Sequence, residues 1–530
     1  MTKRSTIYII FLFVFSTSIV ARDFVITDFG AVGDGITLNT ISIQKAVDEC
    51  ADAGGGRVVV PCGTFVTGSI FLRSNVDFHI EHNAVVLASP NTADFPDIFK
   101  RNHEKKGLIH AEGIENAAIT GFGTINGNGD NPAFLIGGTD PGRTFNIFLK
   151  DSKNIKVQDV VLRNPSFWAF RIYNSDEVFV RGIRIYAHAN FNNDGIDIDG
   201  RNIVISDCLI EATDDALCFK SDDPENVCEN ITVTNCVIAS NCNAIKFGTA
   251  SRSGFRNITI SNCVIKTPAE NDFFNYARYI VPGITTGIAN NSGIALEMVD
   301  GGIFEKISIT NITMNDVHTP IFIRFSNRRG TSQYMKDIII SNIIANSTSL
   351  MTSSITGIPD QYVENVKISN VIFNISGGGL IDHVRRTIPE SEKAYPENRM
   401  LGANLPAYGF YVRHAKNITL DNIRFNVDYT DQRHAIWLED AHNVRLSHIE
   451  SNIHTSQEAY LRLRDVTNVV FSGFSATYDI PLFLHVEGET SKNVKLLFND
   501  FSTVKQLVKQ EKNVTKKAVV TQSNLISKGK

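Results

Sequence analysis

Four aspartates in the middle of the chain are spaced in a way that could do chemistry. Asp194 and Asp197 lie close together, and the adjacent pair Asp214 and Asp215 begins twenty residues after Asp194. Apolar segments flank both groups, and carboxylates are costly to remove from water, so their clustering needs a reason. Carboxylates held together raise the pKa of at least one member, which leaves a protonated acid beside an ionised base. Cleavage of a glycosidic bond requires such a pair.

The residues alone leave three further roles open for this cluster. Asp favours turns, so the cluster could be purely structural. Clustered carboxylates also bind calcium, and a lyase could use that ion to acidify the C5–H of a uronate. The third possibility is a chain that binds carbohydrate without cleaving it.

The segments around the aspartates repeat along the chain. Each unit starts with Asn or a similar residue and alternates apolar with polar residues, which is the period of a strand. No unit can bury its apolar face alone, whereas stacked units share one interior with coils about 4.8 Å apart. We therefore predict an all-β fold, a right-handed parallel β-helix. Representative units are NIKVQDVVL at Asn154, NIVISDCLI at Asn202, NITVTNCVI at Asn230, NITISNCVI at Asn257 and NVKLLFNDF at Asn493.

One helix is expected before the repeats begin. Thr40 can cap a helix over residues 41–53, whose apolar residues recur at helical spacing. These residues are Ile43, Ala46, Val47 and Cys50. An amphipathic helix here would cap the open end of the stack.

The chain divides into three predicted parts. Residues 1–22 carry Lys3 and Arg4 before a short apolar run, which is the layout of a signal peptide. Residues 23–503 would form the β-helix, and residues 504–530 a basic C-terminal tail. A secreted or periplasmic monomer with no membrane span is the expected product. The formal net charge of −5 gives no indication of nucleic-acid binding.

Asn and Cys recur at fixed places in the repeat. Asn202, Asn230 and Asn257 share one place, and we interpret the N-I-T sequences at 230, 257 and 417 as part of an internal Asn ladder rather than as glycosylation sites. A Cys follows each of Asn202, Asn230 and Asn257 by six residues. We therefore expect a stack of free buried thiols at Cys208, Cys236 and Cys263. Disulfides remain possible between Cys50 and Cys62 and between Cys228 and Cys242.

The repeat also places the aspartates relative to one another. Asp194 and Asp214 are separated by about one coil, so they should lie on adjacent coils of one face. Adjacent residues of a regular strand point to opposite faces, so Asp214 and Asp215 should sit at a strand end or bulge. Two long loops, 268–293 and 376–410, interrupt the repeat and are expected to form walls of the site.

Four motifs give the chain a family resemblance that spans roughly residues 24–500. They are FGAVGDG at 29–35, NPSFWAF at 164–170, NNDGIDI at 192–198 and DDALCFKS at 214–221. Together they resemble glycoside hydrolase family 28, which includes polygalacturonases and rhamnogalacturonan hydrolases. The resemblance implies an inverting hydrolysis without metal or cofactor, with Asp214 as general acid and Asp194 and Asp215 as bases. It also implies an acidic or mixed polysaccharide of pectic type as substrate.

The chain departs from the family pattern at two places. Asn243 stands where the family's G-H-G motif has His, and Ala295-Leu296-Glu297 replaces its uronate-binding R-I-K motif. Glu297 would repel a uronate, so a neutral or altered sugar is expected in one subsite next to the scissile bond. The lost positive charge could come instead from other cations near the cleft, namely Lys220, Lys246, Arg252 or Arg324.

Other candidates complete the predicted site. Trp168 could stack on a sugar ring or belong to the core, and Arg413 and His414 could reach the cleft. The favoured function is an exported hydrolase of pectic or related acidic polysaccharides of the galacturonan or rhamnogalacturonan type, such as those of the cell wall. The two long loops favour exo action, since they could close one end of the groove.

Overall fold

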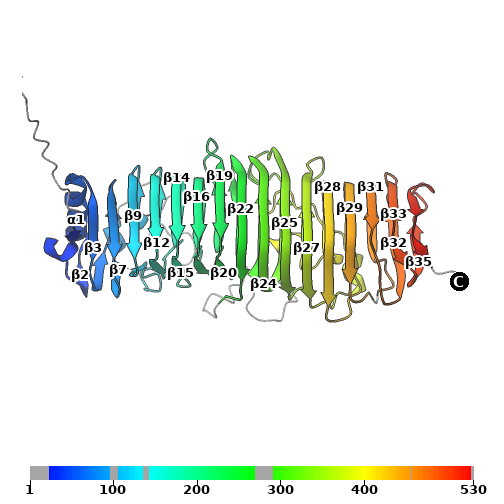
Figure 1. Cartoon of the computed structure of the whole chain (residues 1–530), viewed down its shortest axis with the longest axis horizontal. Coiled ribbons are helices and arrows are strands. Elements are labelled where there is room, and N and C mark those ends of the chain that lie inside the picture. Colours follow the sequence, from blue (N-terminus) through cyan, green and yellow to red (C-terminus); the bar gives the residue numbers. More distant parts are fainter. Residues whose placement is uncertain (1–22, 96–105, 135–142, 269–289, 455, 527–530) are drawn as a thin grey trace, which may run out of the picture.

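Strands run parallel through nearly the whole of the computed structural model, which describes residues 23–95, 106–134, 143–268, 290–454 and 456–526. Thirty-five of these strands belong to one sheet that winds from one end of the chain to the other. Figure 1 shows the result, a long stack in which each coil lies beside the previous one. The predicted all-β parallel β-helix is confirmed. The expected signal peptide, residues 1–22, and most of the loop 268–293 lie outside the described residues.

The N-terminal end of the stack carries the one long helix of the described chain. The helix α1 packs its buried residues Ile43, Ala46, Val47 and Cys50 into the main core, as their spacing predicted. In Figure 1 it lies at the blue end, over β3 and its neighbours. The elements here are β1 (Asp23–Val25), η1 (Ile26–Phe29), β2 (Asp34–Leu38), α1 (Thr40–Asp52), β3 (Gly56–Val60), β4 (Gly63–Thr67), β5 (Ile70–Phe71), β6 (Val76–Ile80), β7 (Ala84–Ala88), η2 (Thr92–Asp94), β8 (Lys106–Glu112), β9 (Glu115–Gly121) and β10 (Thr124–Asn126).

The middle coils keep a constant register, so like residues stack on like. Ile203 pairs with Ile231, which pairs with Ile258, which pairs with Ile307, and all four are buried. Such columns remove apolar surface from water along the whole axis. The elements are β11 (Thr144–Lys150), β12 (Lys153–Gln158), β13 (Val161–Arg163), β14 (Phe170–Arg181), β15 (Arg184–Ala187), β16 (Ile196–Ser206), β17 (Leu209–Ala212), β18 (Leu217–Ser221), β19 (Cys228–Thr234), β20 (Val237–Ser240), β21 (Asn243–Ser251), β22 (Gly254–Ile265), β23 (Asn290–Met298) and β24 (Ile303–Phe325).

The C-terminal coils extend further than the sequence suggested. Residues 504–530 were expected to form a tail, but β35 pairs in parallel with β32, and β36 with β33. Apolar residues such as Val504 and Val508 still alternate there and pack against the core, so the stack continues. The elements are β25 (Tyr334–Ser347), β26 (Ser353–Thr356), β27 (Val363–Ile375), α2 (Ile381–Val384), η4 (Asn398–Leu401), β28 (Ala407–Val427), β29 (His434–Ser451), β30 (Leu461–Arg464), β31 (Thr467–Ser472), β32 (Ile480–Glu487), β33 (Lys492–Leu497), β34 (Asp500–Phe501), β35 (Val504–Gln510), β36 (Val519–Gln522) and β37 (Leu525–Ile526).

One long insert, residues 376–406, leaves the stack between β27 and β28. Its apolar side chains Ile388, Leu401 and Leu405 form a small second core with Tyr411 and Trp437 on the outer face of the sheet. The insert therefore lies on the outside of the coils as a packed unit. Among the described residues, no helix has the length and apolar character that crossing a bilayer requires.

The predicted Asn ladder is present. The Asn230 amide donates to Asn202 over 3.3 Å, and the Asn257 amide donates to Asn230 over 3.1 Å. Each of these Asn residues has a φ between 55° and 57°, the left-handed region that Asn tolerates better than most residues. Further along the stack, Asn417 donates to Asn365. The ladder therefore satisfies both a backbone requirement and a chain of side-chain hydrogen bonds.

All eight cysteines are free. Cys208, Cys236 and Cys263 are buried, and the Sγ of Cys208 donates to the Ser206 carbonyl, a bond that its counterparts repeat. The disulfides considered from the sequence do not form. Cys50 is buried while Cys62 is exposed. Cys228 donates to the Ile198 carbonyl, whereas Cys242 lines a surface cavity, so the members of each pair lie in different surroundings.

The ladder can be tested at Asn230, which both donates and accepts. Replacement by Ala removes both hydrogen bonds and puts at this positive φ a residue that tolerates the left-handed region less well than Asn. The free energy of unfolding should therefore fall by about 1–3 kcal/mol. Asn230→Gly keeps the backbone unstrained and should lose less. Urea denaturation of both variants measures the difference. Equal losses for Ala and Gly would contradict a contribution from backbone conformation.

Candidate active site

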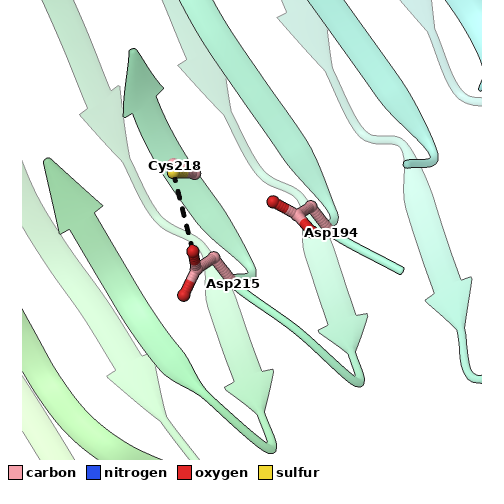
Figure 2. A group of neighbouring side chains, drawn as sticks. All are labelled: Asp194, Asp215 and Cys218. Carbon is pink, nitrogen blue, oxygen red and sulfur yellow. Dashed lines mark hydrogen bonds between the residues drawn. The ribbon is translucent and has the colours of Figure 1, made fainter. Parts of the chain in front are cut away.

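Two of the candidate aspartates hold equivalent places on adjacent coils. Asp194 lies just before β16 and Asp215 just before β18, and these strands pair Ile196 with Leu217. The Gly195 amide donates to the Asp215 carbonyl over 2.9 Å, which fixes the register at this point. Figure 2 shows the two carboxylates side by side at the strand ends. Their nearest side-chain oxygens are within 4.8 Å of each other.

Asp214 adds the third carboxylate from the same turn. One of its oxygens lies within 4.8 Å of one from Asp215 and of the Cys242 Sγ. The Asn192 amide donates to Asp214 over 3.1 Å. Asp194, Asp214 and Asp215 thus line one cavity of about 760 Å³. From the sequence we expected Asp194 to lie opposite Asp214 on the adjacent coil. In the structure, Asp215 holds that place. Asp214 lies one residue earlier, where its backbone amide donates to the Asn193 carbonyl.

The cavity has walls from several parts of the chain. Trp168 and Arg171 stand on one side, and the insert contributes Tyr395 and Glu397. The end of β21 and the turns that follow β21, β23 and β24 form the far wall. The cavity-lining residues of this wall are Thr249, Ala250, Arg252, Asp300, Gly301, Gly302, Arg328, Arg329, Gly330, Thr331 and Gln333.

Two buried lysines neutralise part of the acidic cluster. The Lys220 ammonium lies 3.0 Å from Asp197 and 3.7 Å from Asp194. The Lys246 ammonium lies 3.0 Å from Asp215 and 3.6 Å from Glu297. Burial lowers the pKa of each lysine, but these carboxylates more than offset it and leave both pKa values well above the ordinary value. Both ammonium groups therefore stay charged, and both are committed to protein carboxylates.

Asp215 is the carboxylate that stays ionised. Burial alone would raise its pKa, but Lys246, Lys220 and the Asn243 amide, which donates over 2.8 Å, bring it below the ordinary value. Asp194 behaves in the opposite way. Burial and the negative charges of Asp197 and Asp214 raise its pKa well above the ordinary value. The pKa values of the two neighbours therefore shift in opposite directions, which is the separation that acid–base chemistry needs.

The structure revises three of the expected substrate contacts. Asn243, Lys246 and Glu297 were expected to touch substrate, but they are at most 2% exposed and are not among the cavity-lining residues. Asn243 and Lys246 instead hold Asp215 in place. Burial raises the pKa of Glu297 to about 8, so it carries a proton near neutral pH. Glu297 is therefore not placed to repel a uronate. It lies instead 3.6 Å from the Lys246 ammonium.

Two predicted contacts do line the cavity. Lys220 is 4.6 Å from the centre of the Trp168 ring, and the ring stacks on Phe167 at 4.9 Å. Trp168 is only partly buried and lines the cavity. Of the alternative cations, Arg252 lines the cavity, whereas Arg324 is buried and donates to the carbonyls of Gly357 and Glu390.

Arg413 and His414 anchor the insert rather than the cavity. Arg413 forms an ion pair with Glu390 of the insert. His414 lies between two carboxylates, with Nε2 3.1 Å from Glu390 and Nδ1 2.7 Å from Asp440. These contacts tie the insert to β28 and β29, and so hold Tyr395 and Glu397 over the cavity.

Sequence reasoning missed the residues that the later turns contribute. Asp300, Arg328 and Arg329 lie in turns that follow β23 and β24. The repeat register could have indicated them, since turns one coil apart must stack. Tyr395 and Glu397 carried no such signal, because the insert follows no repeat.

Three groups of side chains among the described residues have the spacing of metal ligands, and two of them lie at this site. The two are Asp194, Asp215 and Cys218, and Asp214, Asp215 and Cys242. Calcium takes six to eight oxygen ligands, whereas each group here offers two carboxylates and a thiol. Lys246 already contacts the shared carboxylate Asp215. This donor set does not fit the calcium ion that a lyase of this fold class would need.

Comparison with known proteins finds relatives over part of the chain. Residues 50–273 match the model of glycosyl hydrolases family 28, so this part of the chain is similar to that family. A probable polygalacturonase of Vitis vinifera is 34% identical over 214 residues, 37% of this chain and 44% of that protein. An exo-poly-alpha-D-galacturonosidase of Dickeya chrysanthemi is 28% identical over 260 residues, 38% of this chain and 43% of that protein. The chain thus spans less than half the length of these two relatives.

Solved structures of exopolygalacturonases share the fold. A hyperthermoactive exopolygalacturonase from Thermotoga maritima superposes with a TM-score of 0.60 at 21% identity, over 76% of this chain and 91% of that one. A family 28 exopolygalacturonase from Yersinia enterocolitica gives 0.53 at 16% identity, over 85% and 78%. At these identities the likeness concerns the architecture alone.

The raised pKa of Glu297 predicts how stability depends on pH. The folded chain holds a proton on Glu297 up to about pH 8, whereas the unfolded chain loses it near the ordinary value of 4.5. Stability from this group is therefore complete below about pH 4.5 and is lost as the pH rises toward 8. We expect Tm to fall between about pH 5 and pH 8, and to fall less in Glu297→Gln.

The same heating experiment has a matched control. Glu364 lies on β27, away from the cavity, so Glu364→Gln should keep the pH dependence of the unsubstituted chain. An unchanged slope in Glu297→Gln would contradict a buried, protonated Glu297.

Proposed function

We propose that this chain is an exported inverting glycoside hydrolase that cleaves galacturonan- or rhamnogalacturonan-type bonds in pectic or related acidic polysaccharides. The observation that carries the proposal is the meeting of Asp194, Asp214 and Asp215 in one open cavity. The match of residues 50–273 to family 28 and the names of the relatives, which include polygalacturonases and an exo-poly-alpha-D-galacturonosidase, support the substrate class.

In the proposed reaction, Asp214 is the general acid. It gives its proton to the glycosidic oxygen as the bond from that oxygen to the anomeric carbon breaks. Water attacks the same carbon from the opposite face of the ring and loses a proton to the base, which inverts the configuration. Inversion is taken from the likeness to family 28, because oxygens of Asp214 and Asp215 lie within 4.8 Å of each other, closer than the roughly 6.5–9.5 Å usual for inverting enzymes. At the end Asp214 is ionised and the base is protonated, so the charges balance.

Asp215 is the stronger of the two candidate bases. Its pKa is lowered by Lys246, Lys220 and Asn243 against the effect of burial, whereas the pKa of Asp194 is raised. Oxygens up to 4.8 Å apart can be bridged by one water that makes two hydrogen bonds of about 2.8 Å. Asp194 would therefore orient the water together with Asp215, and Asp215 would accept its proton.

Exo action is favoured by the walls of the cavity. The insert places Tyr395 and Glu397 at its edge, and Arg413 and His414 anchor the insert to the coils. A polysaccharide that meets a wall on one side can present only its end to the aspartates. Other features expected from the sequence are kept in the proposal, namely the signal peptide, a monomer, the right-handed coil and the capping role of α1.

Substitution of the acid tests the assignment directly. Asp214→Asn keeps the size of the side chain but cannot supply the proton, so kcat on polygalacturonan should fall by about a hundred-fold or more. Circular dichroism and Tm should match the unsubstituted chain. An Asp214→Asn variant that keeps its kcat would reject the role of Asp214.

The products separate the proposed function from its alternatives. Digestion of polygalacturonan and rhamnogalacturonan should release monomers or short units from chain ends, with no unsaturated, ultraviolet-absorbing product and with full activity in chelator. Proton NMR during the reaction should show the inverted anomer first. Unsaturated products lost in chelator would favour a lyase. Glycan binding without any product would favour a binding protein.

A further inference from the structure

The charges of the cavity are unevenly distributed from one end to the other. At its acidic centre lie Asp194, Asp214 and Asp215, with Asp197 and Glu297 packed beneath. Lys220 and Lys246 lie beside these groups, and both already contact carboxyl groups of the protein. Arg171 also acts on Asp197, but it is paired with Asp222. A uronate carboxylate placed here would meet further carboxylates and, among the described residues, no uncommitted cation. A neutral sugar ring therefore fits the acidic centre better.

The far wall of the cavity is built by turns of three successive coils. The Ile303 amide donates to the Ser253 carbonyl over 3.2 Å, and the Gln333 amide donates to the Gly302 carbonyl over 2.9 Å. Gly301 lies against the first turn, because a Cβ added there would stand 3.4 Å from the Arg252 carbonyl oxygen. The turns after β21 and β24 therefore flank the Asp300–Gly302 turn between them.

Four arginines line the cavity, and they differ in what they contact. Arg171 lies 2.5 Å from Asp222, and Arg328 donates its Nε to Asp300 over 2.7 Å, so these two are neutralised. Arg252 and Arg329 are exposed, and within the described part of the chain neither side chain has an ion pair or hydrogen bond. The wall therefore holds two uncommitted guanidinium groups, one on each side of the Asp300–Gly302 turn.

We propose that Arg252 and Arg329 form a subsite for the carboxylate of a uronate, one or more sugars away from the bond that is cut. The sugar at the acidic centre is then neutral or carries a masked carboxylate. A guanidinium group offers a planar fork of donors that matches a carboxylate. The inference rests on the proposed function and names its substrate class, a chain in which charged and uncharged units alternate or mix.

This subsite also accounts for the missing family motif. Position 297 holds a buried, protonated Glu in place of a cation. The positive charge of the cavity comes instead from turns at the ends of β21 and β24. The carboxylate of the uronate is then bound further from the aspartates than it would be by an R-I-K motif at positions 295–297.

Binding to catalytically disabled protein tests the subsite without turnover. In the Asp214→Asn background, calorimetric titration with rhamnogalacturonan oligosaccharides, in which charged and uncharged units alternate, gives their affinities. Addition of Arg252→Gln and Arg329→Gln together should weaken binding of the acidic oligosaccharides about ten-fold or more. Each hydrogen bond between charged groups that is lost removes about 1.5 kcal/mol or more of binding free energy, and about 1.4 kcal/mol corresponds to a ten-fold change in affinity. The same oligosaccharides after carboxyl reduction should bind both proteins equally.

Arg256→Gln is the matched control. Arg256 is paired with Glu229 on the outer surface and does not line the cavity, so its loss should leave the affinity unchanged. Equal binding of acidic oligosaccharides with and without the two cavity arginines would overturn the inference, as would the absence of binding to the Asp214→Asn protein. Hydrolysis by the unsubstituted chain is scored separately. If it fails on every pectic substrate while the arginine effect persists, the proposed function fails and the subsite stands.

Discussion

Backbone hydrogen bonds between neighbouring coils hold the catalytic candidates together. The Gly195 amide bonds to the Asp215 carbonyl and the Ile196 amide to the Ala216 carbonyl, each over 2.9 Å. This parallel pairing brings residues about twenty apart in sequence into contact, and it does so in one register only. A shift of one residue would turn every side chain to the opposite face. The apolar columns of the core oppose such a shift, so packing inside the stack fixes the geometry outside it.

Buried charge is the second constraint. The carboxylates around the cavity would not stay folded and ionised together without cations, and Lys220 and Lys246 provide them from β18 and β21. The arrangement leaves Asp215 ionised and keeps a proton on its neighbour Asp194 to higher pH. Removal of one member leaves an uncompensated buried charge, which is costly. The acidic centre therefore functions as a unit, in which supporting residues such as Asn243 matter as much as those that touch solvent.

Much of this could be read from the residues, for physical reasons that differ from case to case. The strand period and the repeated Asn indicated stacked coils, because both follow from local backbone geometry. The same repeat brought Asp194 near the Asp214–Asp215 pair. The repeat did not show which of the pair faces Asp194, since the turn between β17 and β18 sets that. It also led us to expect Glu297 at the surface, although Glu297 is buried. The repeat could not reveal this burial, because burial depends on the coils to either side. Tyr395 and Glu397 lie in an insert without periodicity, so only its packing on Tyr411 and Trp437 reveals them.

The Asn ladder has a practical consequence for producing this protein. Asn230 and Asn257 each begin an N-I-T sequence, and each uses its side-chain nitrogen to bond to the coil before it. In the secretory pathway of a eukaryotic host, a glycan would be attached to that same nitrogen. The attached sugar would take up the amide that reaches the preceding coil and would crowd the turns stacked on either side. Expression in a bacterial host avoids this competition between modification and coil stacking.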